Sequence, residues 1–293
     1  MDIPEVPPFP ELERWLARRE ASVPGLKPGV AAGIVWADAS HPSPTPISLV
    51  YLHGYTASRG EISPVADRIA AALGANLFYS RLTGHGQDAD AHRTVGVDDW
   101  IQDGLEALEI GRRLGHRVVV LATSTGVSLA AWLILGAPRS AVAASVLISP
   151  NLTPKNRTTE LLLWPGKEWF LNKFMGDMVT NSSKNALNTQ YWDLVHHSHS
   201  LIPMMQLVEV ARTLNFRRWP SPALVVYDLK DSVVDERVTK KLFSRAPTEL
   251  LTLHEWTTFP GEHNHVLAGD ALSPHGTERM VELALGFLQR VLG

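Results

Sequence analysis

Short apolar runs alternate with helix-length amphipathic segments along the chain from Ile47 onward, and this alternation constrains the fold more than any other feature. Apolar runs of strand length are typical of strands buried on both faces, which occur in mostly parallel sheets covered by helices. The pattern predicts an α/β fold with a doubly wound, mostly parallel sheet and helices on both faces. After an entry helix at 10–19 and a strand at 34–36, the expected strands are 48–53, 75–79, 117–122, 142–148, 223–227 and 250–254.

Two of the expected helices carry end signals. Ser58, with Glu61 three residues later, predicts a capping box, in which each side chain binds the backbone N–H of the other residue. This helix is expected to run to Leu73 and to end at Gly74, since glycine readily adopts the left-handed conformation of a helix C-terminus. The second helix, 98–114, places leucine and isoleucine side chains on one face, which we expect to pack against the sheet.

The alternation stops in the middle of the chain, where apolar and aromatic residues lie in helix-like segments without a convincing strand. We expect a helical cap at 151–215, inserted into a core formed by 1–150 and 216–293. Trp164 and Phe170 are candidates for contacts with an apolar acyl group, because ligand pockets are lined mainly by apolar and aromatic side chains. The alternative is that these side chains only pack the cap onto the core.

The composition excludes several classes of protein. The formal net charge is −3 and no block of lysine and arginine is present, so nucleic acid is not expected as a partner. The chain has no cysteine, which excludes disulfides, thiolate zinc sites and a cysteine nucleophile. It shows neither a secretory signal nor an apolar stretch approaching the roughly 20 residues that span a bilayer. We expect a soluble, cytoplasmic protein, whose oligomeric state the sequence leaves open.

The segment around Ser124 predicts a nucleophile on a sharp turn between a strand and a helix. An apolar strand ends at Ala122, and the apolar helix 127–135 follows shortly after Gly126. A nucleophile elbow needs small residues two positions before and two positions after the serine, so that the helix can close on the strand. Ala122 and Gly126 meet this need. The alternative is an ordinary serine at a helix N-terminus.

Two backbone N–H groups are candidates for an oxyanion hole. In this type of fold, one donor comes from the residue after the nucleophile, here Thr125, and the other from the loop after an earlier strand. His53, Gly54 and Tyr55 follow such a strand, so the Tyr55 N–H is the second candidate, and His53 and Gly54 are candidates for substrate contacts. The alternative for this glycine is a plain tight turn.

An acid is expected after a later strand, and three aspartates follow the strand 223–227. Asp231 is the preferred candidate because it lies in the turn before the next helix. Asp235 falls in the first turn of that helix, where a carboxylate complements the helix dipole. Asp228 ends the strand directly and is expected to form a turn.

The base is expected in the loop after the last strand, which contains both His263 and His265. His265 is preferred and His263 is the alternative. Closely spaced histidines also occur in metal sites, and His196, His197 and His199 form a second such group. Neither loop has an acidic cluster at ligand spacing, and we expect the second group to be solvated surface. No metal and no organic cofactor is expected.

Together these motifs resemble the α/β-hydrolase superfamily, and within it the monoacylglycerol-lipase-like and lysophospholipase-like esterases, often labelled serine aminopeptidase-like. The matching segments are Leu52–Tyr55, Gly84–Gly86, Asp231 and His265–Leu267, in the family's order and spacing. Ala122 departs from the glycine that is usual two residues before the nucleophile. The resemblance implies an α/β-hydrolase fold and favours His265 over His263.

The resemblance also implies a reaction. The expected activity is that of a serine hydrolase that cleaves a small-molecule carboxylic ester through an acyl-enzyme intermediate, with Ser124, His265 and Asp231 as the triad. The acyl group is expected to be small or lipid-like and apolar. Two alternatives stay open: amide or C–C bond hydrolysis on the same triad, because the fold hosts both reactions, and a non-catalytic module that binds a ligand.

Overall fold

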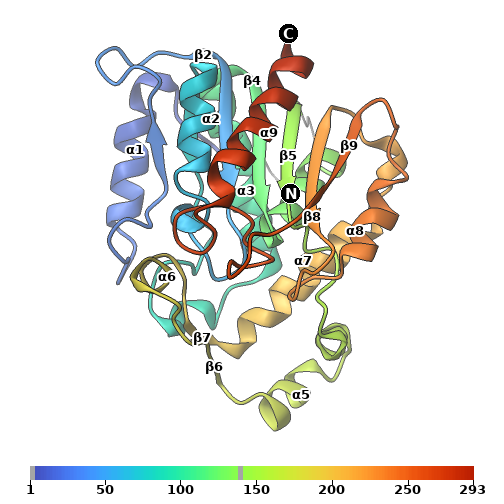
Figure 1. Cartoon of the computed structure of the whole chain (residues 1–293). Helices are drawn as coiled ribbons and strands as arrows, with labels where there is room; N and C mark the ends of the chain where they lie inside the picture. Colours follow the sequence, from blue (N-terminus) through green and yellow to red (C-terminus); the bar gives the residue numbers. More distant parts are fainter. Residues whose placement is uncertain (1–3, 138–140) are drawn as a thin grey trace.

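The computed structural model describes residues 4–137 and 141–293, and its centre is a seven-stranded sheet (Figure 1). β1 is antiparallel to β3, and every other neighbouring pair in this sheet is parallel. The predicted α/β fold with a mostly parallel sheet is therefore confirmed. In spatial order the strands are β1 (Gly33–Val35), β3 (Asn76–Tyr79), β2 (Thr45–Leu52), β4 (Gly115–Thr123), β5 (Val142–Ile148), β8 (Ala223–Asp228) and β9 (Leu251–Trp256).

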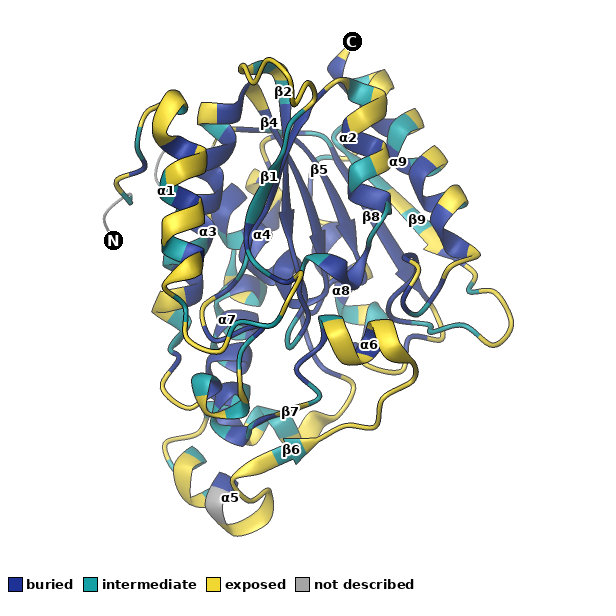
Figure 2. Ribbon diagram, turned by 90° about the vertical axis from the view of Figure 1, so that its left-hand side faces the viewer, coloured by how far each residue is buried: buried dark blue, intermediate teal, exposed yellow. Residues whose placement is uncertain are grey.

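Helices cover both faces of the sheet because successive side chains of a strand point to opposite faces. On β2, Val50 and Leu52 belong to the core on the α1, α3, α4 and α7 side, whereas Leu49 and Tyr51 belong to the core on the α2 and α9 side (Figure 2). Side chains on both faces of β2 are therefore buried, which accounts for its continuous apolar run in the sequence. The helices named here are α1 (Phe9–Ala21), α2 (Val65–Leu73), α3 (Val97–Leu114), α4 (Thr125–Leu135), α7 (Leu201–Thr213) and α9 (Gly276–Leu292).

The predicted capping box at Ser58 and Glu61 is wrong. A short 3-10 turn, η1 (Arg59–Glu61), comes first, and α2 begins only at Val65. Pro64 explains the break, because a residue that precedes proline is disfavoured in the helical conformation and proline has no N–H to donate. The Ser58 hydroxyl instead donates to the Tyr191 carbonyl at 2.9 Å. The helix does end as expected, with Gly74 in the left-handed conformation at φ 57°.

The segment 151–215 contains a strand pair that the sequence did not predict. β6 (Met178–Thr180) and β7 (Val195–His197) are antiparallel, and Met178 pairs with His197. Together with helix α5 they lie at the far end of the molecule, where most of the surface is exposed (Figure 2). The remaining elements of the segment are η3 (Arg157–Leu163), α5 (Lys167–Phe174), α6 (Ala186–Tyr191) and η4 (Ser198–Ser200), followed by α7.

Two loops and one helix at the carboxyl ends of the strands complete the surroundings of the candidate site. Helix α8 (Glu236–Phe243) begins just after Asp235, which is its N-cap and does not lie in its first turn as expected. The loops after β8 and β9 carry the candidate acid and base. Among the helices of residues 4–137 and 141–293, none has the length and apolar character that crossing a membrane requires.

Candidate active site

Ser124 lies at the sharp turn between β4 and α4. Its backbone has φ 52° and ψ −117°, outside the helical and strand regions, and its N–H donates to the Ile148 carbonyl at 2.9 Å. Gly126 explains how the helix can start so close to the strand, since a Cβ atom on this residue would lie 2.2 Å from the Leu52 carbonyl oxygen. The turn therefore has the geometry that a nucleophile elbow requires, with strain that is typical of functional positions.

Ser124, His265 and Asp231 come from three separate loops and form a hydrogen-bonded row, here called the polar row. His265 Nε2 lies 2.9 Å from Ser124 Oγ, and His265 Nδ1 lies 2.8 Å from Asp231 Oδ2. All three residues are at least 90% buried, with exposed fractions of 7%, 6% and 1% in the same order. The row can pass a proton from the hydroxyl to the imidazole, while the carboxylate holds the ring and favours its charged form.

Backbone N–H groups explain why Asp231 faces the imidazole. Its Oδ1 accepts hydrogen bonds from Val233 N at 2.7 Å and Val234 N at 2.9 Å, which leaves Oδ2 directed at His265. The two other aspartates of this region are engaged elsewhere. Asp228 accepts from Lys230 N and from the backbone and hydroxyl of Thr258, and Asp235 binds Arg157 and Arg237. The structure thus brings only Asp231 of the three into the row.

His263 supports the loop that carries His265. Its Nδ1 accepts hydrogen bonds from the backbone N–H groups of His265, at 3.2 Å, and Val266, at 3.1 Å. The Ser149 hydroxyl donates to the His265 carbonyl at 2.6 Å, which holds the loop from its other side. Burial, together with the neighbouring His265, lowers the pKa of His263. The imidazole hydrogen-bonded to Ser124 is that of His265, and His263 orients the chain behind it.

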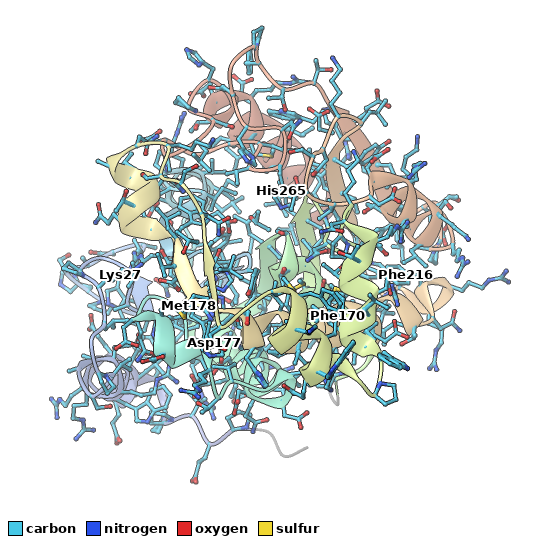
Figure 3. The ribbon with its side chains drawn as sticks, turned by 90° about the horizontal axis from the view of Figure 1, so that it is seen from below. Lys27, Phe170, Asp177, Met178, Phe216 and His265 are labelled. Atoms are coloured by element: carbon cyan, nitrogen blue, oxygen red, sulfur yellow. The ribbon has the colours of Figure 1, made fainter. Side chains whose placement is uncertain are left out.

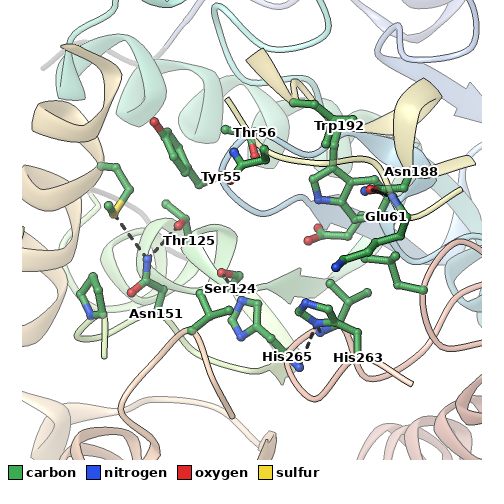
Figure 4. Close-up of a pocket in the computed structure, with 18 of the residues that line it drawn as sticks. Tyr55, Thr56, Glu61, Ser124, Thr125, Asn151, Asn188, Trp192, His263 and His265 are labelled. Atoms are coloured by element: carbon green, nitrogen blue, oxygen red, sulfur yellow. Dashed lines mark hydrogen bonds between the residues drawn. The ribbon is translucent and has the colours of Figure 1, made fainter. Parts of the chain in front are cut away.

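The two N–H groups predicted for the oxyanion hole flank Ser124. Within the described chain, neither the Tyr55 N–H nor the Thr125 N–H donates to another protein group, so both are free to bind a ligand oxygen. Tyr55 and Thr125 line the same pocket as Ser124 (Figure 4). Gly54 allows this approach, because a Cβ atom at this position would lie 3.2 Å from Ser124 Cβ.

The Tyr55 side chain is tied to the segment 151–215. Its hydroxyl lies 2.6 Å from Ser200 Oγ and 3.2 Å from His196 Nδ1, and burial raises its pKa. The ring also packs edge-on against Trp100. The hydroxyl is thus occupied by protein partners, and the ring forms a wall of the pocket.

The pocket has a volume of about 450 Å³ and a mixed lining of apolar and polar side chains. Polar groups gather beside Trp192, on the side of Ser124 where Asn188, Glu61 and His263 lie (Figure 4). The described residues that line it are Tyr55, Thr56, Glu61, Ser124, Thr125, Asn151, Pro154, Asn181, Ser182, Lys184, Asn188, Trp192, Leu194, Leu201, Met204, Val233, His263, His265, Val266 and Leu272.

Three of the side chains expected to contact substrate are not among the described residues that line this pocket. Trp164 is 55% exposed. Phe170 lies on α5, where its ring packs 5.3 Å from that of Phe174, apart from His265 (Figure 3). The His53 ring is buried, with Nε2 accepting from Leu82 N at 3.0 Å and Nδ1 2.8 Å from the Gly54 carbonyl. Trp164 is thus exposed, Phe170 packs on its own helix, and His53 holds backbone groups of neighbouring loops.

A cluster of buried imidazoles lies beside the loop that carries Tyr55, and no sequence pattern predicted it. Neighbouring rings are 4.9 to 5.7 Å apart. Asp193 anchors it, accepting from His92 Nε2 at 3.0 Å and Gly86 N at 2.9 Å. His196 was expected at the solvated surface and is instead 2% exposed, because its ring packs on Tyr55. The histidine cluster consists of His53, His85, His92 and His196.

His197 and His199, the other two members of the predicted histidine-rich patch, are more accessible than His196. The His199 side chain lies 3.4 Å from Glu168 and is 36% exposed. Within residues 4–137 and 141–293, no group of three or more histidines, aspartates or glutamates has an arrangement that could hold a metal ion.

Glu61 is a further acid in the pocket wall that the sequence analysis assigned to a helix cap. It is 3% exposed, and its carboxylate accepts hydrogen bonds from Gly54 N at 2.8 Å and the Tyr51 hydroxyl at 2.9 Å. Burial raises its pKa. The proline at position 64 was the one sequence signal that argued against a cap here.

Comparisons with known proteins place this geometry in context. A family model described as serine aminopeptidase, S33, matches residues 44–260. A search of curated proteins finds no match. Among solved structures, one reported for the metagenome-derived lipolytic enzymes LipS and LipT is similar, with a TM-score of 0.73 and 19% identity over 90% of this chain and 99% of that chain.

Two lipase structures are also similar. A monoacylglycerol lipase of Paleococcus ferrophilus gives a TM-score of 0.63 at 12% identity, over 87% of this chain and 98% of that chain. A soluble variant of the monoglyceride lipase of Saccharomyces cerevisiae gives a TM-score of 0.64 at 11% identity, over 89% of this chain and 91% of that chain. At these identities the likeness shows a shared fold.

Proposed function

The chain belongs to the serine aminopeptidase S33 family of α/β-hydrolases, and from this membership we propose that it is a serine hydrolase that cleaves carboxylic esters of small or lipid-like apolar acyl groups. The observation that carries the proposal is the polar row, in which His265 Nε2 lies 2.9 Å from Ser124 Oγ and its other nitrogen 2.8 Å from Asp231. A module that only binds a ligand has no need of this arrangement.

The reaction proceeds in two steps. His265 Nε2 takes the proton of Ser124 as its oxygen attacks the ester carbonyl, and the carbonyl oxygen becomes an anion bound by the Tyr55 and Thr125 N–H groups. The tetrahedral intermediate collapses, His265 gives its proton to the departing alcohol, and an acyl group stays on Ser124. Water, activated by His265, then attacks this acyl group and releases the acid. Asp231 stays ionised throughout and stabilises the imidazolium.

The lining of the pocket supports an ester with an apolar acyl part. Leu201, Met204 and Val233 offer apolar surface in a cavity of about 450 Å³, which lies within the range of small-molecule sites. Asn188 and Trp192 also line it, and both belong to the segment 151–215. We therefore propose that this segment acts as a cap that completes the substrate site.

Replacing Ser124 with alanine tests the proposal. Turnover of a short p-nitrophenyl ester should fall by about 10⁴-fold or more, because no other group can form the acyl-enzyme. Circular dichroism and thermal unfolding of the variant should match the wild type, since the hydroxyl contributes little packing. Turnover retained at the wild-type rate would move the nucleophile elsewhere.

A series of p-nitrophenyl esters tests the acyl group. We expect kcat/KM to rise from the acetyl ester to an acyl chain of medium length, because each added methylene is buried against apolar surface. A steep preference for the acetyl ester would count against an apolar acyl site.

A further inference from the structure

Glu61 is a buried acid in the wall of the pocket, with no ion-pair partner among the described residues. Burying a carboxylate without hydrogen-bond partners costs free energy, so a buried carboxylate is expected to hold its partners in place. Here a single oxygen, Oε2, receives both hydrogen bonds, from Gly54 N and from the Tyr51 hydroxyl. Its partners therefore indicate what the side chain holds in place.

The first partner belongs to the loop that carries the oxyanion candidate. The bond from the Gly54 N–H to Glu61 fixes the peptide plane before Gly54. The Gly54 carbonyl, which belongs to the next peptide plane, accepts from Ala57 N at 3.2 Å. In a trans peptide the carbonyl and the following N–H point in opposite directions, so a held Gly54 carbonyl sets the direction of the Tyr55 N–H. Both planes around Gly54 are thus fixed.

The second partner joins this loop to the nucleophile turn. The Tyr51 hydroxyl that donates to Glu61 also lies 3.2 Å from Thr123 Oγ1, in the residue before Ser124. A Cβ atom placed on Gly54 would lie 2.7 Å from Glu61 Oε1 and 3.2 Å from Ser124 Cβ. Glu61 and Ser124 therefore both lie against the Cβ position of Gly54.

The backbone of Glu61 is itself held by the loop that follows His265. A Cβ atom on Gly269 would lie 2.7 Å from the Glu61 carbonyl oxygen, so this close approach depends on glycine. Gly269 has φ 107°, which also favours glycine. The side chain of Glu61 is thus supported by a rigid contact at its base.

We propose that Glu61 is a positioning residue of the oxyanion hole. Its carboxylate accepts the Gly54 N–H and fixes the peptide plane before Gly54. The next plane, whose Gly54 carbonyl accepts from Ala57 N and lies 2.8 Å from His53 Nδ1, then directs the Tyr55 N–H toward the oxygen that develops charge on Ser124 attack. This inference rests on the proposed function. This positioning role requires a hydrogen-bond acceptor on the side chain of residue 61 and not a negative charge. A glutamine, whose amide oxygen accepts in the same place, should serve nearly as well.

The test compares Glu61→Gln with Glu61→Met, which has similar length but no oxygen acceptor. Loss of an oxyanion donor typically lowers kcat by about 10²- to 10³-fold, and we expect a misdirected donor in Glu61→Met to lower kcat by about 10²-fold. Because the donor acts on the transition state, KM should change by less than about 3-fold. Glu61→Gln should keep kcat within about 5-fold of the wild type.

Two further readouts separate positioning from a general structural effect. Affinity for an arylboronic acid, which forms a tetrahedral adduct with the serine, should fall in Glu61→Met in parallel with kcat. Amide hydrogen exchange of a peptide covering 53–57 should become faster in Glu61→Met and stay protected in Glu61→Gln. Tyr79→Phe is the matched control, because it removes a buried hydroxyl that binds Asp67 outside the site, and its kcat should not change.

The outcomes decide the proposal. Wild-type kcat in Glu61→Met, or an equal loss of kcat in Glu61→Gln and Glu61→Met, would overturn it. If Glu61→Met does not fold, two milder variants replace it: Glu61→Gln, and Tyr51→Phe, which removes only the second hydrogen bond to Glu61. The proposal then requires that Glu61→Gln shows wild-type amide exchange at 53–57 and a kcat within about 5-fold of the wild type. Failure of the proposed function would appear differently, as a wild-type protein without ester turnover, and the exchange comparison would still test the positioning of Gly54.

Discussion

His265 and the histidine cluster are both buried beside the same pocket, and they differ in what their ring nitrogens face. Each nitrogen of His265 meets a polar side chain, Ser124 on one side and Asp231 on the other. In the cluster, rings contact rings, His53 binds backbone groups and His92 Nε2 faces Asp193, while His85 Nε2 and His92 Nδ1 have no hydrogen-bond partner among the described residues. Burial of an imidazole is thus common to both, and what sets His265 apart is that one nitrogen faces a hydroxyl and the other a carboxylate.

The charge state follows from the same difference. Burial lowers the pKa of His53 and of His196 to about 4, and it lowers the pKa of His85 well below its ordinary value. His53, His85 and His196 are therefore neutral near pH 7 and behave as part of the core. His265 has a carboxylate at 2.8 Å that compensates a positive charge on its ring.

The largest effect should come from His265 itself. We expect His265→Ala to lower kcat for ester hydrolysis by about 10⁴-fold or more, because no base remains to take the serine proton. His85→Leu, in the histidine cluster, should keep kcat within about 3-fold, since it removes a ring whose Nε2 has no hydrogen-bond partner in the part of the chain that the structure describes. Steady-state kinetics of both variants measure the contrast. If His265→Ala and His85→Leu lose kcat to a similar extent, the polar row and the histidine cluster do not differ in their contribution to the reaction.

The second-largest effect is expected at Asp231. Asp231→Asn should lower kcat by about 10³- to 10⁴-fold, because the amide no longer stabilises the imidazolium or the required tautomer. Asp228→Asn is the matched control, as its carboxylate binds Lys230 N and Thr258 and not the imidazole. Kinetic measurements with the same ester should find kcat of the control within about 10-fold of the wild type. The reverse ranking would mean that Asp228 is the acid.

The histidine cluster should respond to acid. The pKa values of His53, His85 and His196 lie below the ordinary 6.5, so the unfolded chain binds more protons than the folded one below that pH. Stability is then full above pH 6.5 and falls as the pH drops toward 4, by about 1.4 kcal/mol per pH unit for each such histidine. Urea unfolding of the wild type and of His85→Leu at several pH values measures this. The free energy of unfolding should fall less steeply with decreasing pH in the variant, and the difference in slope should correspond to about one bound proton. Identical slopes in the two proteins would contradict this expectation.

The smallest effect is expected at His263. His263→Ala removes the acceptor for the N–H groups of His265 and Val266, so the loop loosens but the base remains. We expect kcat to fall by about 10-fold, far less than in His265→Ala. A loss as large as that of His265→Ala, measured in the same assay, would make His263 the base.

Much of the fold followed from the sequence because the apolar pattern reports burial. The strand Val142–Ile148 was predicted to the residue, since nearly every side chain in it is buried. β6 and β7 were missed for the same reason. Each has only three residues, most of them at least partly exposed, so no run of apolar residues marks them.

The candidate site was predictable only in part. The residues around Ser124 carry a local signal, because the close approach of Gly126 to Leu52 requires a small residue. The choice among the three aspartates depends on where the N–H groups of Val233 and Val234 point, which the chain alone does not reveal. Glu61 was assigned to a cap because its partner, Gly54, lies seven positions earlier in a loop whose conformation depends on tertiary contacts.

The central claim is that Ser124 is a nucleophile activated by His265. Labelling the intact protein with a fluorophosphonate and mapping the adduct by mass spectrometry tests it most directly, because this reagent captures an activated serine. If His265 activates Ser124, one adduct per chain should form, on Ser124, and it should form far more slowly in His265→Ala. An adduct on another residue, or equally fast labelling of Ser124 without His265, would contradict it.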